Sequence, residues 1–258
     1  MRKELAGYAQ TTIALIAVIF LWEVLCRVLA IPKWLLPAPS QIAAETWEIR
    51  EILPLHFGAT LAAVVGGFAL AVITGIPLAV LVVYSPFMRR VIFPFLLTLQ
   101  SVPKVALAPL LLLWVGYGLH SNMIVAATVA FFPIVINTAT GLESVDKELL
   151  ELTRSLDASA ARVFWRVRLP WSMPYIFSSF KVAITLAVIG AVVAEFVGSD
   201  KGLGYLILTS SGAMKTTVMF GMLVLLSALG MASFYAVAWA EKKLCPWYMP
   251  AENEPPPL

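Results

Sequence analysis

The chain has 258 residues, of which 60% are hydrophobic and only 13% are charged, and its mean hydropathy is +0.89. A soluble domain carries about a quarter charged residues, so this much apolar surface cannot all lie inside one globular core. The composition therefore excludes a soluble enzyme, a nucleic-acid-binding domain and a disordered regulator. Two cysteines near opposite ends of the chain predict neither a disulfide framework nor a metal site. We predict an all-α, polytopic integral membrane protein.

Six stretches of the chain are long and apolar enough to cross a bilayer, which takes about 20 residues of helix. The first could be a signal peptide, but it lacks a small-residue cleavage site, so we expect a retained helix. After it, Ser40 is the predicted N-cap of a surface helix. The third stretch should be broken by Pro103 and Pro109, whereas Gly66, Gly67 and Gly75 should allow close helix packing. The predicted spans are 10–31, 57–83, 91–114, 122–140, 174–197 and 216–240, within a single domain of residues 1–258.

The distribution of Lys and Arg predicts the orientation of these helices. With the N-terminus in the cytoplasm, the inner segments hold eleven basic residues and the outer segments four. This asymmetry follows the positive-inside rule, so both termini, including the tail 241–258, are expected in the cytoplasm. The inner set is Arg2, Lys3, Arg89, Arg90, Lys147, Arg154, Arg162, Arg166, Arg168, Lys242 and Lys243, and the outer set is Lys33, Arg50, Lys201 and Lys215.

The cytoplasmic segment between the fourth and fifth spans concentrates ten charges in residues 143–168. Leu149, Leu152 and Leu156 repeat at helical spacing. A turn follows, after which Ser159 is expected to cap a second short helix that Leu169-Pro170 ends. A solvated loop is the simpler interpretation, but apolar anchors alternating with charges over two helices favour a docking surface.

The same loop resembles the cytoplasmic signature of the membrane subunits of binding-protein-dependent ABC importers. That signature is Glu-Ala-Ala, three residues, Gly, nine residues, Ile, one residue and Leu-Pro. This chain keeps every spacing with Glu151-Leu152-Thr153, Asp157, Val167 and Leu169-Pro170. Asp157 replaces the glycine, and Asp is among the residues that tolerate a left-handed turn.

Three further stretches are similar to the nitrate/sulfonate/taurine-type branch of this family: Leu36–Ser40, Ser101–Leu110 and Ala194–Gly204. Members of the branch and its relatives carry sulfonates, nitrate, bicarbonate, aromatic carboxylates, riboflavin or thiamine-pyrimidine precursors. The resemblance implies the type I ABC importer permease fold in a bacterial inner membrane. It also implies import of a small anionic or heteroaromatic organic solute by alternating access.

The resemblance further implies that this subunit is not an enzyme. The sequence has no Gly-x-x-x-x-Gly-Lys-Ser/Thr phosphate loop, so ATP and Mg are expected on a separate cytoplasmic ATPase dimer. The other expected partners are a periplasmic or lipid-anchored solute-binding protein, a second permease copy in a homodimer, and membrane lipids, with no nucleic acid. The residues expected in the ATPase-coupling loop are Glu151, Leu156, Asp157, Ser159, Arg162, Phe164, Arg166, Leu169 and Pro170.

Polar residues inside the spans are candidates for the translocation pathway, because ionisable groups in a membrane are costly. Lys104 lies in mid-span beside the two prolines, where it would face an anionic or carbonyl-rich solute or else pair with a neighbour. For Glu195 an ion pair or a contact with the binding protein is the stronger expectation, and Glu23 and Arg27 should pair with each other. The pathway candidates are Gln100, Ser101, Lys104, Asn137 and Glu195.

Two other classes of protein compete with this interpretation. A secondary transporter or channel should show inverted repeats and several membrane acids, whereas Glu23 and Glu195 are the only acids inside the predicted spans. A membrane enzyme should show a catalytic motif, but the two histidines, His56 and His120, are predicted on different external turns, and no Gly-x-Ser-x-Gly elbow is present.

Overall fold

The computed structural model describes residues 2–248, and every regular element in that range is a helix. The α-helices are α1 (Arg2–Val28), α2 (Pro39–Glu48), α3 (Leu53–Tyr84), α4 (Phe93–Gln100), α5 (Ala108–Val115), α6 (Leu119–Glu143), α7 (Lys147–Ser155), α8 (Ala160–Val163), α9 (Leu169–Gly198), α10 (Leu203–Gly212) and α11 (Thr216–Leu244). Short irregular turns η1 (Met88–Ile92), η2 (Lys104–Leu107) and η3 (Phe164–Arg168) join some of them.

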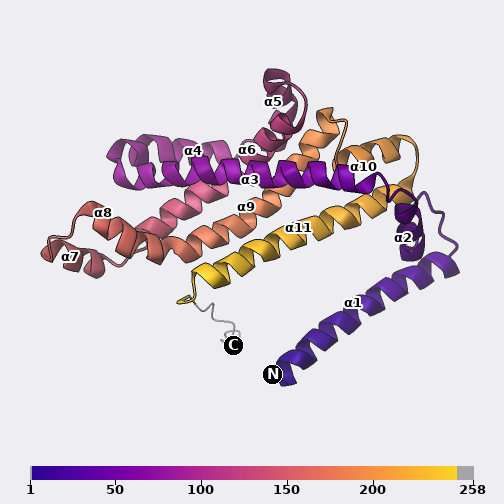
Figure 1. Cartoon of the computed structure of the whole chain (residues 1–258), viewed down its shortest axis with the longest axis horizontal. Helices are drawn as coiled ribbons and strands as arrows, with labels where there is room; N and C mark the ends of the chain where they lie inside the picture. The colour runs from indigo at the N-terminus through magenta and orange to yellow at the C-terminus, as the bar shows by residue number, and fades with distance from the viewer. Residues whose placement is uncertain (1, 249–258) are drawn as a thin grey trace.

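Helices α3, α6 and α9 form the centre of the molecule, and α11 runs alongside α9 (Figure 1). Small residues allow the three central backbones to approach closely, as in other membrane bundles. A Cβ atom on Gly67 of α3 would lie 2.5 Å from the Cβ of Ala126 on α6, and one on Gly190 of α9 would lie 2.8 Å from the Cα of the same alanine. The packing role predicted for Gly66, Gly67 and Gly75 is confirmed, because each abuts α6.

The six predicted spans are only partly reproduced. Among the described residues, four helices are long and apolar enough to cross a membrane: α3, α6, α11 and the continuous run Ala160–Gly198. A fifth is added if α4 and α5 count as one broken span. Helix α1 covers most of the first predicted span but ends three residues early, at Val28. The tail beyond residue 248 lies outside the described residues.

The predicted break of the third span at Pro103 is confirmed, and it divides the span into two segments bent by 89°. The break falls at residues 101–103, where Pro103 follows the end of α4 and removes a backbone donor. The break predicted at Pro109 is absent, because this proline lies in the first turn of α5. A proline is tolerated there, since the first helical N–H groups have no partner within the helix.

Helix α1 stands apart from the central helices and is joined to them through α2 (Figure 1). The predicted Glu23–Arg27 ion pair is confirmed at 2.6 Å. Glu23 also accepts hydrogen bonds from the amide of Ser40 at 2.9 Å and from its hydroxyl at 2.7 Å. The N-cap prediction for Ser40 is therefore wrong: the cap position is Ala38, because the serine hydroxyl ties α2 to α1 instead.

Helix α10 was not predicted from the sequence. It begins after Gly202, whose φ of 119° is accessible to glycine and strained for other residues, and it packs against α9, α11 and α3 at the end of the molecule that also holds α2 (Figure 1). Its ten residues are too few to cross a bilayer, so the segment between the fifth and sixth spans folds back onto the ends of the core helices that lie farthest from α7 and α8, next to α2 (Figure 1).

The close packing of α6 makes Gly67 sensitive to substitution. Gly67→Val places methyl groups where Ala126 and the backbone of Met123 already lie, and overpacking of this kind costs about 1–3 kcal/mol. We expect a lower midpoint of thermal unfolding in detergent, measured by fluorescence-detected size exclusion. Gly230→Val is the matched control, because no atom lies within 4 Å of a Cβ at that position. Equal midpoints for the two variants would contradict the close packing.

Candidate functional site

The segment between α6 and α9 forms a helix–turn–helix that projects from one end of the molecule (Figure 1). Helix α7 ends at Ser155 with Leu156 as its C-cap, and Asp157 adopts a left-handed conformation with φ of 49°. The amide of Asp157 donates to the carbonyl of Arg154 at 3.0 Å, and that of Ala158 donates to Thr153 at 3.1 Å. This is a helix C-terminus of the left-handed type, usually made with glycine, so the predicted turn at Asp157 is confirmed.

The second half of this loop departs from the prediction. Ser159 occupies the N-cap position of α8, but its side chain makes no capping hydrogen bond. Leu169-Pro170 was expected to end the helix, yet α8 continues through the π-type turn η3 into α9, with Pro170 in the first turn of α9. The wide π turn already departs from the regular hydrogen-bond ladder, so a proline can follow it without breaking the rod. The loop is thus continuous with a core helix.

The outer face of the loop exposes large apolar side chains beside charges. Leu152 is 56% exposed, Leu156 71% and Trp165 66%. Exposed charged residues stand beside them in the sequence on both sides of the turn: Glu151, Asp157, Arg162 and Arg166. An apolar surface rimmed by charges is typical of a site that contacts another protein. We call the loop 147–168 the docking loop.

The root of the docking loop is clamped to the ends of α3 and α6. The Phe164 ring packs edge-on against Tyr84, with centroids 6.1 Å apart. The guanidinium of Arg168 lies 5.5 Å from the same tyrosine ring and donates to the carbonyl of Leu142 at 3.0 Å. Phe164 was expected on the docking face, but it is only partly exposed and acts as an anchor of the loop. A force on the loop therefore reaches three helices.

The pathway candidates lie in three places: the bend between α4 and α5, helix α6 and helix α9. Gln100, Ser101 and Lys104 lie together at the bend between α4 and α5, and Asn137 lies partly exposed on α6. The Lys104 ammonium is not free: it donates to the carbonyl of Gln100 at 2.9 Å and lies 4.5 Å from the centroid of the Phe132 ring. These contacts stabilise a carbonyl that the bend leaves without a helical partner.

Glu195 lies elsewhere and is buried within the chain, with 1% of its surface exposed. Its carboxylate forms no ion pair among the described residues, which contradicts the predicted pairing. Instead it accepts a hydrogen bond from the Thr60 hydroxyl at 2.8 Å and one from the amide of Gly204 at 2.7 Å. Because no solvent-facing surface remains, Glu195 does not face a pathway in this structure; it anchors the start of α10 to α3 and α9.

His56 and Thr60 lie beside Glu195, and we call these three residues the outer anchor. Neither His56 nor Thr60 was identified as a functional candidate from the sequence. The Thr60 oxygen accepts from the amide of Leu203 at 2.8 Å, and His56 Nδ1 accepts from the amide of Gly202 at 3.1 Å. His56 was predicted on an external turn, but it is buried in the first turns of α3. One signal was available: His56 and Thr60 are spaced i,i+4 and so share one face of a helix.

The outer anchor gives a stability prediction. Glu195→Ala leaves the buried Gly204 amide without an acceptor and reduces the Thr60 hydroxyl to its longer bond with the His56 carbonyl at 3.3 Å. An unsatisfied buried group costs about 1–3 kcal/mol. We expect a lower unfolding midpoint for Glu195→Ala and a smaller loss for Glu195→Gln, which keeps one acceptor oxygen. Glu48→Gln on the exposed face of α2 is the control. An alanine variant as stable as the parent would rule out an anchoring role.

Comparison with known proteins agrees with this architecture. Residues 67–244 match the family model described as the binding-protein-dependent transport system inner membrane component. The formylaminopyrimidine transport permease protein ThiX of Halalkalibacterium halodurans is 34% identical over 92% of this chain and 95% of its own length. The riboflavin transport system permease protein RibX of Chloroflexus aurantiacus is 32% identical over 91% and 88%. The taurine transport system permease protein TauC of Escherichia coli is 24% identical over 96% and 93%.

A solved structure shows the same fold. An inward-facing form of the MetNI methionine ABC transporter contains a chain that superposes with a TM-score of 0.68 at 20% identity, covering 76% of this chain and 98% of that one. The matched family region contains the docking loop, the bend and Glu195. His56 and Thr60 precede it in the sequence. The chain therefore belongs to the inner-membrane components of binding-protein-dependent transport systems, and it is the permease subunit of an ABC importer.

Proposed function

We propose that this permease imports a small heteroaromatic organic solute across a bacterial inner membrane, driven by a dimer of cytoplasmic ATPases that dock on the loop 147–168. The exposed Leu152, Leu156 and Trp165 on that loop carry the docking part of the proposal. The ATPases would bind ATP and Mg. A binding protein outside the membrane would deliver the solute to the end that holds α2 and α10.

The docking loop transmits movement because it is stiff at both ends. Glu151, Leu156, Asp157, Arg162 and Arg166 present the contact face, and Ser159 lies at the start of the second helix. Leu169 and Pro170 continue the loop into α9 without a hinge. The clamp on Tyr84 carries the same displacement to α3. Closure of the ATPase dimer would then tilt α9 and α3 together, which is the two-state rearrangement that alternating access requires.

The orientation and assembly belong to the same proposal. Because the docking loop and the end of α11 carry most of the inner basic residues, both termini would be cytoplasmic. Helix α1 leaves wide apolar faces uncovered, with Ile16 62% and Phe20 67% exposed. Lipids and a second copy of the chain in a homodimer would cover them.

The heteroaromatic class is supported by the relatives. ThiX and RibX, named for a formylaminopyrimidine and for riboflavin, are 34% and 32% identical to this chain, whereas TauC is 24% identical. Lys104, the sole charged residue of the segment 93–115, donates to a neutral backbone carbonyl and lies over a ring, so its positive charge stays available to an anion. An anionic solute is the second candidate, on the strength of the taurine and nitrate relatives.

Transport in proteoliposomes tests the solute class. The chain is reconstituted with the ATPase and the binding protein that are encoded by adjacent genes. ATP-dependent uptake is then compared for labelled formylaminopyrimidine, riboflavin, taurine and nitrate. We expect uptake of a heteroaromatic compound alone. Uptake of taurine or nitrate without either heteroaromatic compound would overturn this class and favour the anionic one.

The turn at Asp157 tests the docking loop. Asp157→Ile forces a β-branched residue into the left-handed conformation, which costs about 1–2 kcal/mol and should tilt α7 away from α8. We expect ATP hydrolysis to become uncoupled from solute uptake, whereas Asp157→Gly, which relieves the strain, retains both. Both rates are measured in the same proteoliposomes, with the level of assembled complex as control. Undiminished uptake in the isoleucine variant would remove Asp157 from the coupling mechanism.

A further inference from the structure

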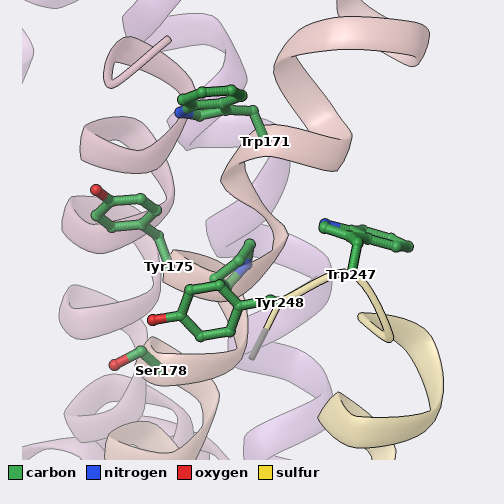
Figure 2. A pocket seen from close by; sticks show the side chains of 6 residues that line it. Trp171, Tyr175, Ser178, Trp247 and Tyr248 are labelled. Atoms are coloured by element: carbon green, nitrogen blue, oxygen red, sulfur yellow. The ribbon is translucent and has the colours of Figure 1, made fainter. Parts of the chain in front are cut away.

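A cavity at the docking-loop end of the molecule is lined almost entirely by aromatic rings. Its volume is about 510 Å³, and its lining comes from two segments distant in sequence. Figure 2 shows Trp171, Tyr175 and Ser178 on the first turns of α9, with Trp247 and Tyr248 on the turn that follows α11. This volume lies within the roughly 300–1,000 Å³ typical of small-molecule sites.

The turn that carries Trp247 and Tyr248 has a defined geometry. The amide of Cys245 donates to the carbonyl of Glu241 at 2.7 Å, and that of Tyr248 donates to Cys245 at 3.0 Å. The Cys245 side chain is buried beneath this turn. Glu241 is paired with Lys181 of α9 at 2.8 Å, which fixes the end of α11 against α9. The two aromatic segments are thus held opposite each other by contacts outside the cavity.

The chemistry of the lining selects a class of ligand. No lining residue is charged, and the nearby Lys181 is neutralised by Glu241. Stacking on aromatic faces tolerates any planar ring, while the hydroxyls and indole N–H groups offer hydrogen bonds to ring nitrogens and carbonyls. A sulfonate or nitrate ion would find no cation among the residues that line the cavity.

We propose that this cavity is a cytoplasmic-side binding site for the heteroaromatic solute, holding its ring between the aromatic side chains of α9 and those of the turn after α11. The ligand class rests on the proposed function, whereas the place and the residues rest on the geometry above. A row of interfacial aromatics that only contacts lipid is the competing explanation. That row would show no selective affinity for soluble ring compounds.

The test measures binding of riboflavin and formylaminopyrimidine to the detergent-purified permease–ATPase complex by equilibrium dialysis, without the binding protein and with taurine as the comparison compound. We expect both ring compounds to bind and taurine not to bind. Tyr175→Leu and Trp247→Leu should each weaken binding about ten-fold, the size of one lost stacking contact. Tyr175→Phe, which keeps the ring, should bind nearly as the parent does.

Tyr235→Leu is the matched control, because Tyr235 is an exposed aromatic on α11 that does not line the cavity. Absent binding by the parent complex, or equal weakening in the control, would overturn the site. Binding that depends on Tyr175 in a complex that transports only taurine would keep the site and reject the proposed solute. Transport of a heteroaromatic compound without binding at the cavity would reject the site and keep the proposed function.

Discussion

The architecture depends on how closely α6 approaches its two neighbours. Ala126 lies between Gly67 of α3 and Gly190 of α9, with no room for a side chain at either glycine. In lipid, helices gain no hydrophobic driving force from pairing, so dispersion contacts between closely approaching backbones must hold them together. This triple contact joins the three helices into one unit, and the bend, the docking loop and α10 are all attached to it.

Both ends of this unit are fixed by contacts between side chains and backbone groups of distant segments. At one end, the start of α10 donates three backbone hydrogen bonds, from Gly202 to His56, from Leu203 to Thr60 and from Gly204 to Glu195. The Thr60 hydroxyl in turn donates to Glu195. At the other end, Tyr84, Arg168 and Leu142 hold the root of the docking loop. A displacement imposed on the loop is therefore delivered to rigid helices and not absorbed by a flexible joint. The aromatic cavity lies beside that root, so a ligand in it would contact the helix that the loop moves.

Helix α1 illustrates a part of the chain whose contacts within one copy are few. It is tied to α2 by Glu23, Arg27 and Ser40 and to α11 by the Trp22–Phe220 ring contact, while its apolar surface stays exposed. Such a surface is stable only in lipid or against another protein, and this is the reason for proposing that lipids and a second copy of the chain cover it.

The class of protein, the approximate positions of the long helices, the break at Pro103, the turn at Asp157 and the pairing of Glu23 with Arg27 could all be predicted from the sequence. These follow from hydropathy, from charge distribution, from proline chemistry and from spacing along one helix, all of which are local properties. The 89° angle of the bend, the presence of α10, the continuity of the loop through Pro170 and the burial of Glu195 emerged only from the three-dimensional packing. Each of these depends on which residues meet from distant segments: Thr60 and Gly204 around one carboxylate, Phe132 against Lys104, and Tyr84 beneath Phe164. Local spacing carries no information about such partners, because packing in space and not order in the chain brings them together.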